Sequence, residues 1–230
     1  MSLSEFKKEL RLSVNLEKKE FLPKFFKTGK GQYGEGDKFL GVVVPDIKKI
    51  SKKFNVQLTD QDLEKLLYSE WHEERFAGWF LISIRYKKSN EHYYNFSKKH
   101  IKQLNNWDLV DMIAPKVIGE YLVLANEDLF IKWSNSKSLW IRRIAVMSTW
   151  PKIRNNDFAI TFKIAKKYLE DPEDLIHKAT GWMLREIAKR DQESVVTFIK
   201  TNKRFMPRVM LRYTIERMDE ALRKELLSWH

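Results

Sequence analysis

Four helix-forming segments recur at nearly equal spacing along this chain of 230 residues, and the repeat limits the possible folds more than any other feature. The segments surround Arg75, Leu109, Arg143 and Lys178, which are roughly 34 residues apart. Each follows a polar turn and an earlier helical pattern. A period of this length with two helices per unit is typical of helical solenoids, in which each repeat packs on its neighbours.

The rest of the sequence also favours helices. Apolar residues recur at helical spacing over 62–67 and 76–82, without an alternation of period two. Residues 59–62 and 170–174 have the polar and acidic pattern of helix starts. Only Val42-Val43-Val44 resembles a strand, and Pro45 ends it. We therefore predict an all-α, HEAT-like solenoid: a single repeat domain over residues 1–230, with a basic concave face.

Net charge limits the kinds of partner the protein can bind, and the absence of cysteine indicates the cellular compartment. The 43 Lys and Arg against 31 Asp and Glu give a formal net charge of +12, which favours an anionic partner. Nucleic acid, acidic membrane surfaces and acidic proteins are all open at this point. Cysteine is absent, which excludes disulfides and thiolate metal sites and favours a reducing compartment.

The chain also lacks the segments that direct a protein to a membrane. No apolar run approaches the roughly 20 residues that a membrane span needs. Residues 1–10 have the pattern of an amphipathic helix start and lack the apolar core of a signal peptide. We expect a cytoplasmic protein with no membrane partner.

Glycine is concentrated in one loop, residues 28–41, which holds five of the eight glycines. The loop matches neither a dinucleotide nor a P-loop fingerprint, because no strand precedes it and no Lys-Ser/Thr pair follows the spacing. It is either a disordered connector or a lid that touches ligand. Tyr33 and Lys30 are the residues through which a lid would contact nucleic acid.

Trp107 and Asp111 are the most informative pair in the sequence. Residues four apart share one face of a helix, so an aromatic ring and a carboxylate would lie side by side. A carboxylate on a surface that meets a polyanion is repelled by phosphate, and a positive charge developing in the substrate would explain its presence. The alternative interpretation is that Asp111 is a structural carboxylate paired with a nearby arginine. Asp108 lies on nearly the same face and competes for either role.

A second group of candidates lies on the helix predicted over residues 175–189. Lys178, Trp182, Arg185 and Lys189 share one face, while a stripe of apolar residues faces the core. One interpretation is that Trp182 packs on the next repeat while the cations are solvated. The other is that the ring and the cations both contact a bound nucleotide, the cations at the backbone and the ring at sugar or base.

Two adjacent arginines lie one repeat earlier. Arg142 and Arg143 point about 100° apart on a helix, so one can anchor a phosphate while the other pairs with a carboxylate. The five histidines show no metal-like spacing with acids, and there is no Gly-x-Ser-x-Gly motif. We expect neither a metal nor an organic cofactor, and no serine or cysteine nucleophile.

Four motifs, in order and spacing, make the chain resemble the AlkD-like family of DNA alkylation repair enzymes over roughly residues 5 to 225. They are Phe39-Leu40-Gly41-Val42-Val43-Val44-Pro45, Trp107-Asp108-Leu109-Val110-Asp111, Trp140-Ile141-Arg142-Arg143 and Gly181-Trp182-Met183-Leu184-Arg185-Glu186. The resemblance implies HEAT-like repeats and a monofunctional glycosylase that releases cationic N3- and N7-alkylpurines from duplex DNA. We also expect a monomer, because nothing in the sequence demands a dimer.

The resemblance also implies roles for single residues. Asp111 matches the family's catalytic acid, Trp107 and Trp182 its aromatic contacts, and Arg143 its backbone arginine. Lys178, Arg185 and Lys189 would extend the basic wall, and Tyr33 is the candidate for an aromatic that lies against DNA. Two alternatives remain: a non-catalytic HEAT-repeat protein that binds nucleic acid, and a protein scaffold.

Overall fold

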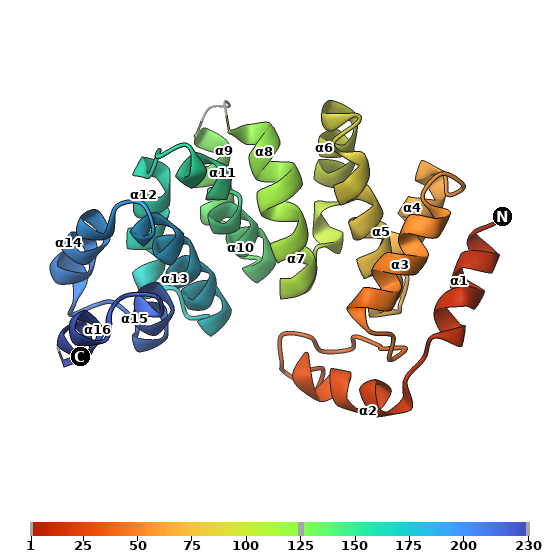
Figure 1. Ribbon diagram of the computed structural model, residues 1–230, viewed down its shortest axis with the longest axis horizontal. Coiled ribbons are helices and arrows are strands. Elements are labelled where there is room, and N and C mark those ends of the chain that lie inside the picture. Colours follow the sequence, from red (N-terminus) through yellow and green to blue (C-terminus); the bar gives the residue numbers. More distant parts are fainter. Residues whose placement is uncertain (1, 124–126, 229–230) are drawn as a thin grey trace. The chain divides into compact units, whose positions relative to one another are not determined.

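The computed structural model describes residues 2–123 and 127–228, which are helical apart from turns and short extended segments (Figure 1). The chain divides into two compact units, Met1–Ile113 and Ala114–His230. The first unit holds α1 Leu3–Leu12, α2 Leu16–Phe25, α3 Val44–Phe54, α4 Asp60–Leu67, α5 His72–Arg85, α6 Asn90–Lys99, the 3-10 helix η1 Ile101–Gln103 and α7 Trp107–Ile113. The second holds the π-helix η2 Ala114–Ile118, α8 Gly119–Leu122, α9 Asp128–Ser134, α10 Leu139–Met147, α11 Trp150–Arg154, α12 Ala159–Lys167, the 3-10 helix η3 Tyr168–Glu170, α13 Asp174–Ala188, α14 Gln192–Asn202, α15 Arg208–Ile215 and α16 Glu220–Ser228.

The predicted all-α helical-repeat fold is confirmed, and the four repeat positions fall on α5, α7, α10 and α13. The described residues contain no strand, only an isolated bridge between Lys38 and Trp71. A single domain over residues 1–230 and a basic concave face stay predictions. None of the described helices has the length and apolarity required to cross a bilayer.

Residues 42–44, the one strand-like run in the sequence, do not form a strand. Val43 is extended but is the residue before α3, and Val44 and Pro45 open that helix. Proline suits the first turn of a helix because its missing N–H would have no helical partner there. The preceding backbone N–H groups of Leu40, Gly41 and Val42 donate instead to the buried carboxylate of Glu73, at 2.7–3.2 Å.

In the first unit α5 is the central helix, and it packs on α3, α4 and α7 (Figure 1). Its residues from His72 to Ile82 are all buried, including the indole of Trp79. A helix buried on all sides needs neighbours on all sides. α4 begins as the sequence predicts: the Thr59 side chain accepts from the Asp62 N–H at 3.2 Å, and the Asp62 carboxylate accepts from the Thr59 N–H at 3.0 Å.

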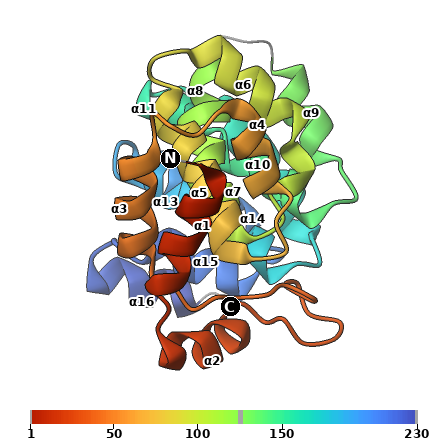
Figure 2. The same ribbon diagram turned by 90° about the vertical axis from the view of Figure 1, so that its right-hand side faces the viewer.

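α2 differs from its neighbours because none of its residues is buried. It lies beyond one end of α1 and α3 in both views of the first unit (Figures 1 and 2). Phe21 and Phe25 stack at 5.7 Å on its surface and are each about half exposed. A helix that exposes aromatic rings beside lysines presents a surface suited to a partner.

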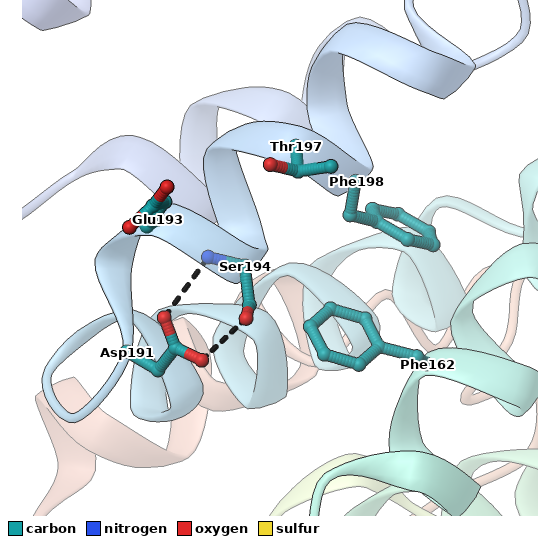
Figure 3. Close-up of a pocket in the computed structure, with 6 residues that line it drawn as sticks. All are labelled: Phe162, Asp191, Glu193, Ser194, Thr197 and Phe198. Carbon is teal, nitrogen blue, oxygen red and sulfur yellow. Dashed lines mark hydrogen bonds between the residues drawn. The ribbon is translucent and has the colours of Figure 1, made fainter.

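In the second unit α13 is the central helix, and it packs on α10, α11, α12, α14 and α15. The predicted apolar stripe is confirmed, because all six of its residues are buried: Ile176, Ala179, Thr180, Met183, Leu184 and Ile187. Asp191 starts the next helix, α14, by accepting from the Ser194 N–H at 3.0 Å (Figure 3).

We predict that Gly181→Ala destabilises the protein, although alanine is the better helix former by about 1 kcal/mol. A Cβ at this position would lie 2.6 Å from the Met210 carbonyl oxygen and 2.6 Å from the Tyr213 Cβ. α13 and α15 must then separate, at a cost of about 1–3 kcal/mol. Chemical denaturation measures the difference, and an unchanged or raised midpoint would contradict the tight approach of the two helices.

Candidate functional site

Trp107 and Asp111 lie on α7, as the sequence predicts, at its first residue and one turn later. The helix start is fixed by two side chains: the Trp107 N–H donates to Asn106 Oδ1 at 2.8 Å, and the Leu109 N–H donates to Asp108 Oδ1 at 2.9 Å. Trp107 and Asp111 are both half-buried. The first turn of α7 therefore holds ring and carboxylate on a helix whose start is capped.

The ring of Trp107 is held by aromatic residues from the end of α2. Phe26 stacks on it with ring centres 5.3 Å apart and planes 14° apart, and Phe25 contacts it edge-on at 6.0 Å. Phe26 in turn stacks on Phe39 at 4.9 Å. Such contacts contribute about 0.5–1.5 kcal/mol per pair beyond buried area, and they restrict the rotamer of the indole.

Asp108 and Asp111 are distinguished by their surroundings. The second carboxylate oxygen of Asp108 contacts Nε2 of His72 at 2.8 Å, and the Asp108 side chain is only 14% exposed. Asp108 therefore holds α7 against α5. Asp111, one turn after Trp107, is the acid to which the proposal below assigns catalysis.

His72 lies between two carboxylates. Its Nε2 faces Asp108, and its Nδ1 faces Asp37 at 3.0 Å, with the His72 side chain 4% exposed. Burial alone would lower the pKa of His72, but the charges and hydrogen bonds of Asp108 and Asp37 outweigh it and raise this pKa to about 9. The histidine is an imidazolium at neutral pH, with both ring N–H groups donating.

Asp37 collects further donors from the same buried cluster. Arg75 donates to one of its oxygens, and Asn106 Nδ2 donates to the other at 3.2 Å. Burial raises the pKa of Asp37, but its contacts with His72 and Arg75 hold it below the ordinary 3.8. Two acids and two bases thus form a cluster whose charges balance.

The Gly-rich loop is a hydrogen-bonded structure rather than a disordered connector. Its backbone closes on itself through Gly34 N–H to the Lys27 carbonyl at 3.1 Å and Gly36 N–H to the Thr28 carbonyl at 3.4 Å. The Tyr33 hydroxyl donates to the Phe25 carbonyl at 3.4 Å, next to the rings that hold Trp107. Lys30 is exposed at the tip. Contact of Tyr33 and Lys30 with DNA stays a prediction.

Gly41 explains part of the motif over residues 39–45. It has φ +95°, and a Cβ there would lie 2.6 Å from the Asn15 carbonyl oxygen. The Glu73 carboxylate holds the backbone on the other side. The motif thus closes the base of the Gly-rich loop against α2 and α5.

The predicted face of α13 consists mainly of paired side chains. The Trp182 indole N–H donates to Glu186 at 3.2 Å, and Lys189 pairs with the same carboxylate oxygen at 2.6 Å. Arg185 pairs with Glu216 of the neighbouring turn and donates to the Tyr213 carbonyl. Lys178 is half-buried and forms no ion pair within residues 2–123 and 127–228.

The two adjacent arginines of α10 have different roles. Arg142 binds Asp171 through two nitrogens, at 2.6 and 3.2 Å, and donates to the Ser136 and Lys137 carbonyls. It is therefore the arginine that makes the internal pair. Arg143 is 4% exposed and donates to the Leu175 carbonyl of α13. A phosphate contact by either arginine stays a prediction.

The structure groups the candidates by unit. Trp107, Asp111, Tyr33 and Lys30 belong to the first, and Trp182 and the remaining cations belong to the second. Sequence reasoning missed the groups that hold α7: Phe25, Phe26, Asp37, His72 and Arg75. The sequence does hold a signal for Asp37 and His72. Asp37 lies 35 residues before His72, and His72 lies 36 residues before Asp108, so the three recur at about the repeat period.

Of two hollows in the described surface, only one lies near these residues. One, of about 260 Å³, is apolar and lies beside the cluster, between Phe21, Phe39, Val42 and Phe76, with His72 and Asp108 in its wall. The other, of about 530 Å³, lies between Phe162 and Phe198 in the second unit and contains no predicted site residue (Figure 3). The described part of the chain contains no group of three His, Asp or Glu side chains placed to hold a metal ion.

Comparison with known proteins identifies the class. The chain belongs to the DNA alkylation repair enzyme family, whose model matches residues 6–218. No curated protein matches the chain. Its role is accordingly in DNA repair, with DNA as the substrate.

Three solved structures are similar in fold, each at 18% sequence identity. A predicted DNA alkylation repair enzyme from Enterococcus faecalis has a TM-score of 0.73 and covers 90% of this chain and 98% of its own. AlkD2 from Streptococcus mutans has a TM-score of 0.54, with 94% and 97% covered. The protein smu.31 from Streptococcus mutans UA159 has a TM-score of 0.52, with 95% and 96% covered.

We predict that the cluster around His72 makes stability fall at alkaline pH. A histidine whose pKa is raised to about 9 in the folded state stabilises the protein fully below its unfolded value of 6.5, and this contribution is lost as pH rises through 9. The advantage of wild type over His72→Gln in free energy of unfolding should shrink by about 2–3 kcal/mol between pH 6 and pH 10.

Denaturant titrations of both proteins across this range provide the test. The matched control is His92→Gln, because His92 pairs with Asp60 at 2.6 Å but is half exposed. Its difference from wild type should stay small. A pH-independent difference between wild type and His72→Gln would contradict the charged bridge.

Proposed function

We propose that the protein is a monofunctional DNA glycosylase that hydrolyses the N-glycosidic bond of cationic N3- and N7-alkylated purines in duplex DNA. Asp111 is the catalytic carboxylate, and Trp107 and Trp182 are the aromatic contacts. No cofactor takes part in the reaction. Family membership supports the repair role. The observation that carries the catalytic assignment is that Asp111 lies one turn after Trp107 on α7, where ring and carboxylate share one side of the helix.

The chemistry needs a carboxylate and little else. An alkylated purine carries a positive charge and leaves readily, and the deoxyribose becomes cationic as the bond breaks. A fixed carboxylate stabilises that charge and orients the attacking water. The faces of Trp107 and Trp182 are electron-rich and favour the same cation. The leaving base takes the bonding electrons and becomes neutral, water supplies the hydroxyl group to the sugar carbon, and the proton that water loses passes to the Asp111 carboxylate and then to solvent.

The surroundings of Trp107 support a role at the DNA backbone. A ring packed on Phe26 and Phe25 is preorganised and costs little entropy when substrate arrives. α2 presents exposed Phe21 and Phe25 beside Lys18, whose ammonium lies 5.4 Å from the Phe21 ring centre. Rings flanked by cations are a common surface for nucleic acid.

In this proposal the enzyme grips the sugar and phosphates and leaves the lesion in the base stack. The hollow beside the His72 cluster supports that mode, because its lining is mainly apolar and the carboxylates of Glu73 and Asp108 in its wall already have partners within the protein. Such a lining leaves few polar groups with which a flipping enzyme could read a base edge. The cations that reach phosphate are Arg143 and Lys178, with Lys30 from the Gly-rich loop.

We predict that purified protein releases 7-methylguanine or 3-methyladenine from methylated duplex DNA, and that Asp111→Asn slows the release about 10²–10³-fold, as the loss of a preorganised electrostatic stabiliser does. Duplex binding should persist. Chromatography of the released base under single-turnover conditions measures the rates. A non-enzymatic DNA-binding protein would release no base, and a protein scaffold would bind no duplex near physiological salt.

We predict that Lys178→Ala weakens duplex binding uniformly across sequences and lowers the slope of log K against log salt by about 1, because one released counterion is lost. The control is Lys163→Ala, an exposed lysine of α12 that the proposal leaves off the DNA surface. Fluorescence anisotropy over a salt series gives both slopes. Equal slopes for Lys178→Ala and wild type would remove Lys178 from the interface.

A further inference from the structure

A buried bridge joins the Gly-rich loop to α7 through a single histidine of α5. Asp37 at the end of the loop contacts His72 Nδ1 at 3.0 Å, and Asp108 in the first turn of α7 contacts His72 Nε2 at 2.8 Å. The three side chains are 8%, 4% and 14% exposed. A surface ion pair contributes little, but a buried pair with both partners hydrogen-bonded fixes geometry strongly.

The same histidine lies against the rings that hold Trp107. Phe39 covers one His72 face at 4.7 Å with planes 23° apart, and Phe26 approaches at 4.9 Å. Phe26 then stacks on Trp107. The polar edge of His72 thus fixes the helix backbone, and its faces support the indole. Both the start of α7 and its aromatic residue depend on one side chain.

We propose that His72 is a positioning residue: bridging Asp37 and Asp108 as a cation, it sets the first turn of α7 and thereby the placement of Trp107 and Asp111. The catalytic part of this inference rests on the proposed glycosylase function. His72 itself touches neither substrate nor reacting atoms in this scheme, and the Gly-rich loop acts on the site through Asp37.

Charge makes the bridge conditional on protonation. Asp37 from the loop, Asp108 from α7 and Arg75 from α5 face His72, and Arg75 Nη2 lies 3.5 Å from His72 Nδ1. Lys18 and Glu73 line the neighbouring hollow, and the Glu73 carboxylate points to the backbone of residues 40–42. A neutral imidazole has one N–H and can serve only one of the two carboxylates. Deprotonation therefore breaks the bridge on one side.

The first test is a side-chain nitrogen NMR titration of the free protein, which needs no activity. Both ring nitrogens of His72 should carry protons at pH 7, with titration near 9. In Asp108→Asn the titration should move down by at least one unit. A single protonated nitrogen at pH 7, or a midpoint at or below 6.5, would overturn the proposal. Asp108→Asn keeps the size of the side chain and serves if His72→Gln fails to fold.

The second test compares kinetics. His72→Gln should lower the single-turnover rate of base release about 10-fold with duplex affinity unchanged, and should remove an alkaline limb near pH 9 from the wild-type rate profile. His92→Gln, on the exposed pair with Asp60, should behave as wild type in both measurements. A wild-type rate and pH profile in His72→Gln would overturn the positioning role.

Failure of the proposed function would be visible separately. If wild type releases no base, the positioning role is read from the Trp107 indole N–H resonance, assigned by Trp107→Phe. A shift of that resonance in Asp108→Asn supports the bridge, because the first turn of α7 then moves. An unshifted resonance contradicts it.

Discussion

The imidazolium of His72 between two buried carboxylates is the interaction on which the first unit depends. Each buried charge costs several kcal/mol in lost hydration, and only pairing with good geometry offsets that cost. Arg75 and Asn106 complete the hydrogen bonding of Asp37, and the charges of the two acids and two bases balance. Loop, α5 and α7 are then fixed to one another by polar contacts as well as by apolar packing. Asp108 thus has a structural role in holding α7, and the catalytic role is proposed for Asp111 on the same helix.

In the second unit, side chains of the candidate site are also held by ion pairs and hydrogen bonds, but from different residues. Arg142 secures Asp171, and Trp182 is oriented by Glu186, which Lys189 also contacts. Several cations that would count toward an open basic wall therefore have structural partners. Net charge alone overstates the number of side chains ready for phosphate, and Arg143 too is buried and donates to the Leu175 carbonyl. Membership of the DNA alkylation repair family makes DNA the substrate, and the contacts of single cations with it stay predictions.

Much of the fold could be predicted from local pattern. The spacing of the repeat, the Thr59 start of α4 and the buried stripe of α13 each depend on neighbours within one or two turns. The contact between the Glu73 carboxylate and the backbone N–H groups of Leu40, Gly41 and Val42 could not be predicted, because Glu73 is distant in sequence. Trp107 and Asp111 could be chosen from the motif, but the separation of Asp111 from Asp108 could not. It depends on His72, a contact across one repeat that no local pattern specifies.

The central claim is that two acids three residues apart on α7 have different functions, one catalytic and one structural. The most direct measurement is the single-turnover rate of alkylpurine release by Asp111→Asn beside that by Asp108→Asn, with the unfolding midpoint of each. We expect Asp111→Asn to lose at least 10-fold more rate and little stability, and Asp108→Asn to lose mainly stability. The reverse order, with Asp108→Asn the slower enzyme and Asp111→Asn the less stable protein, would contradict it.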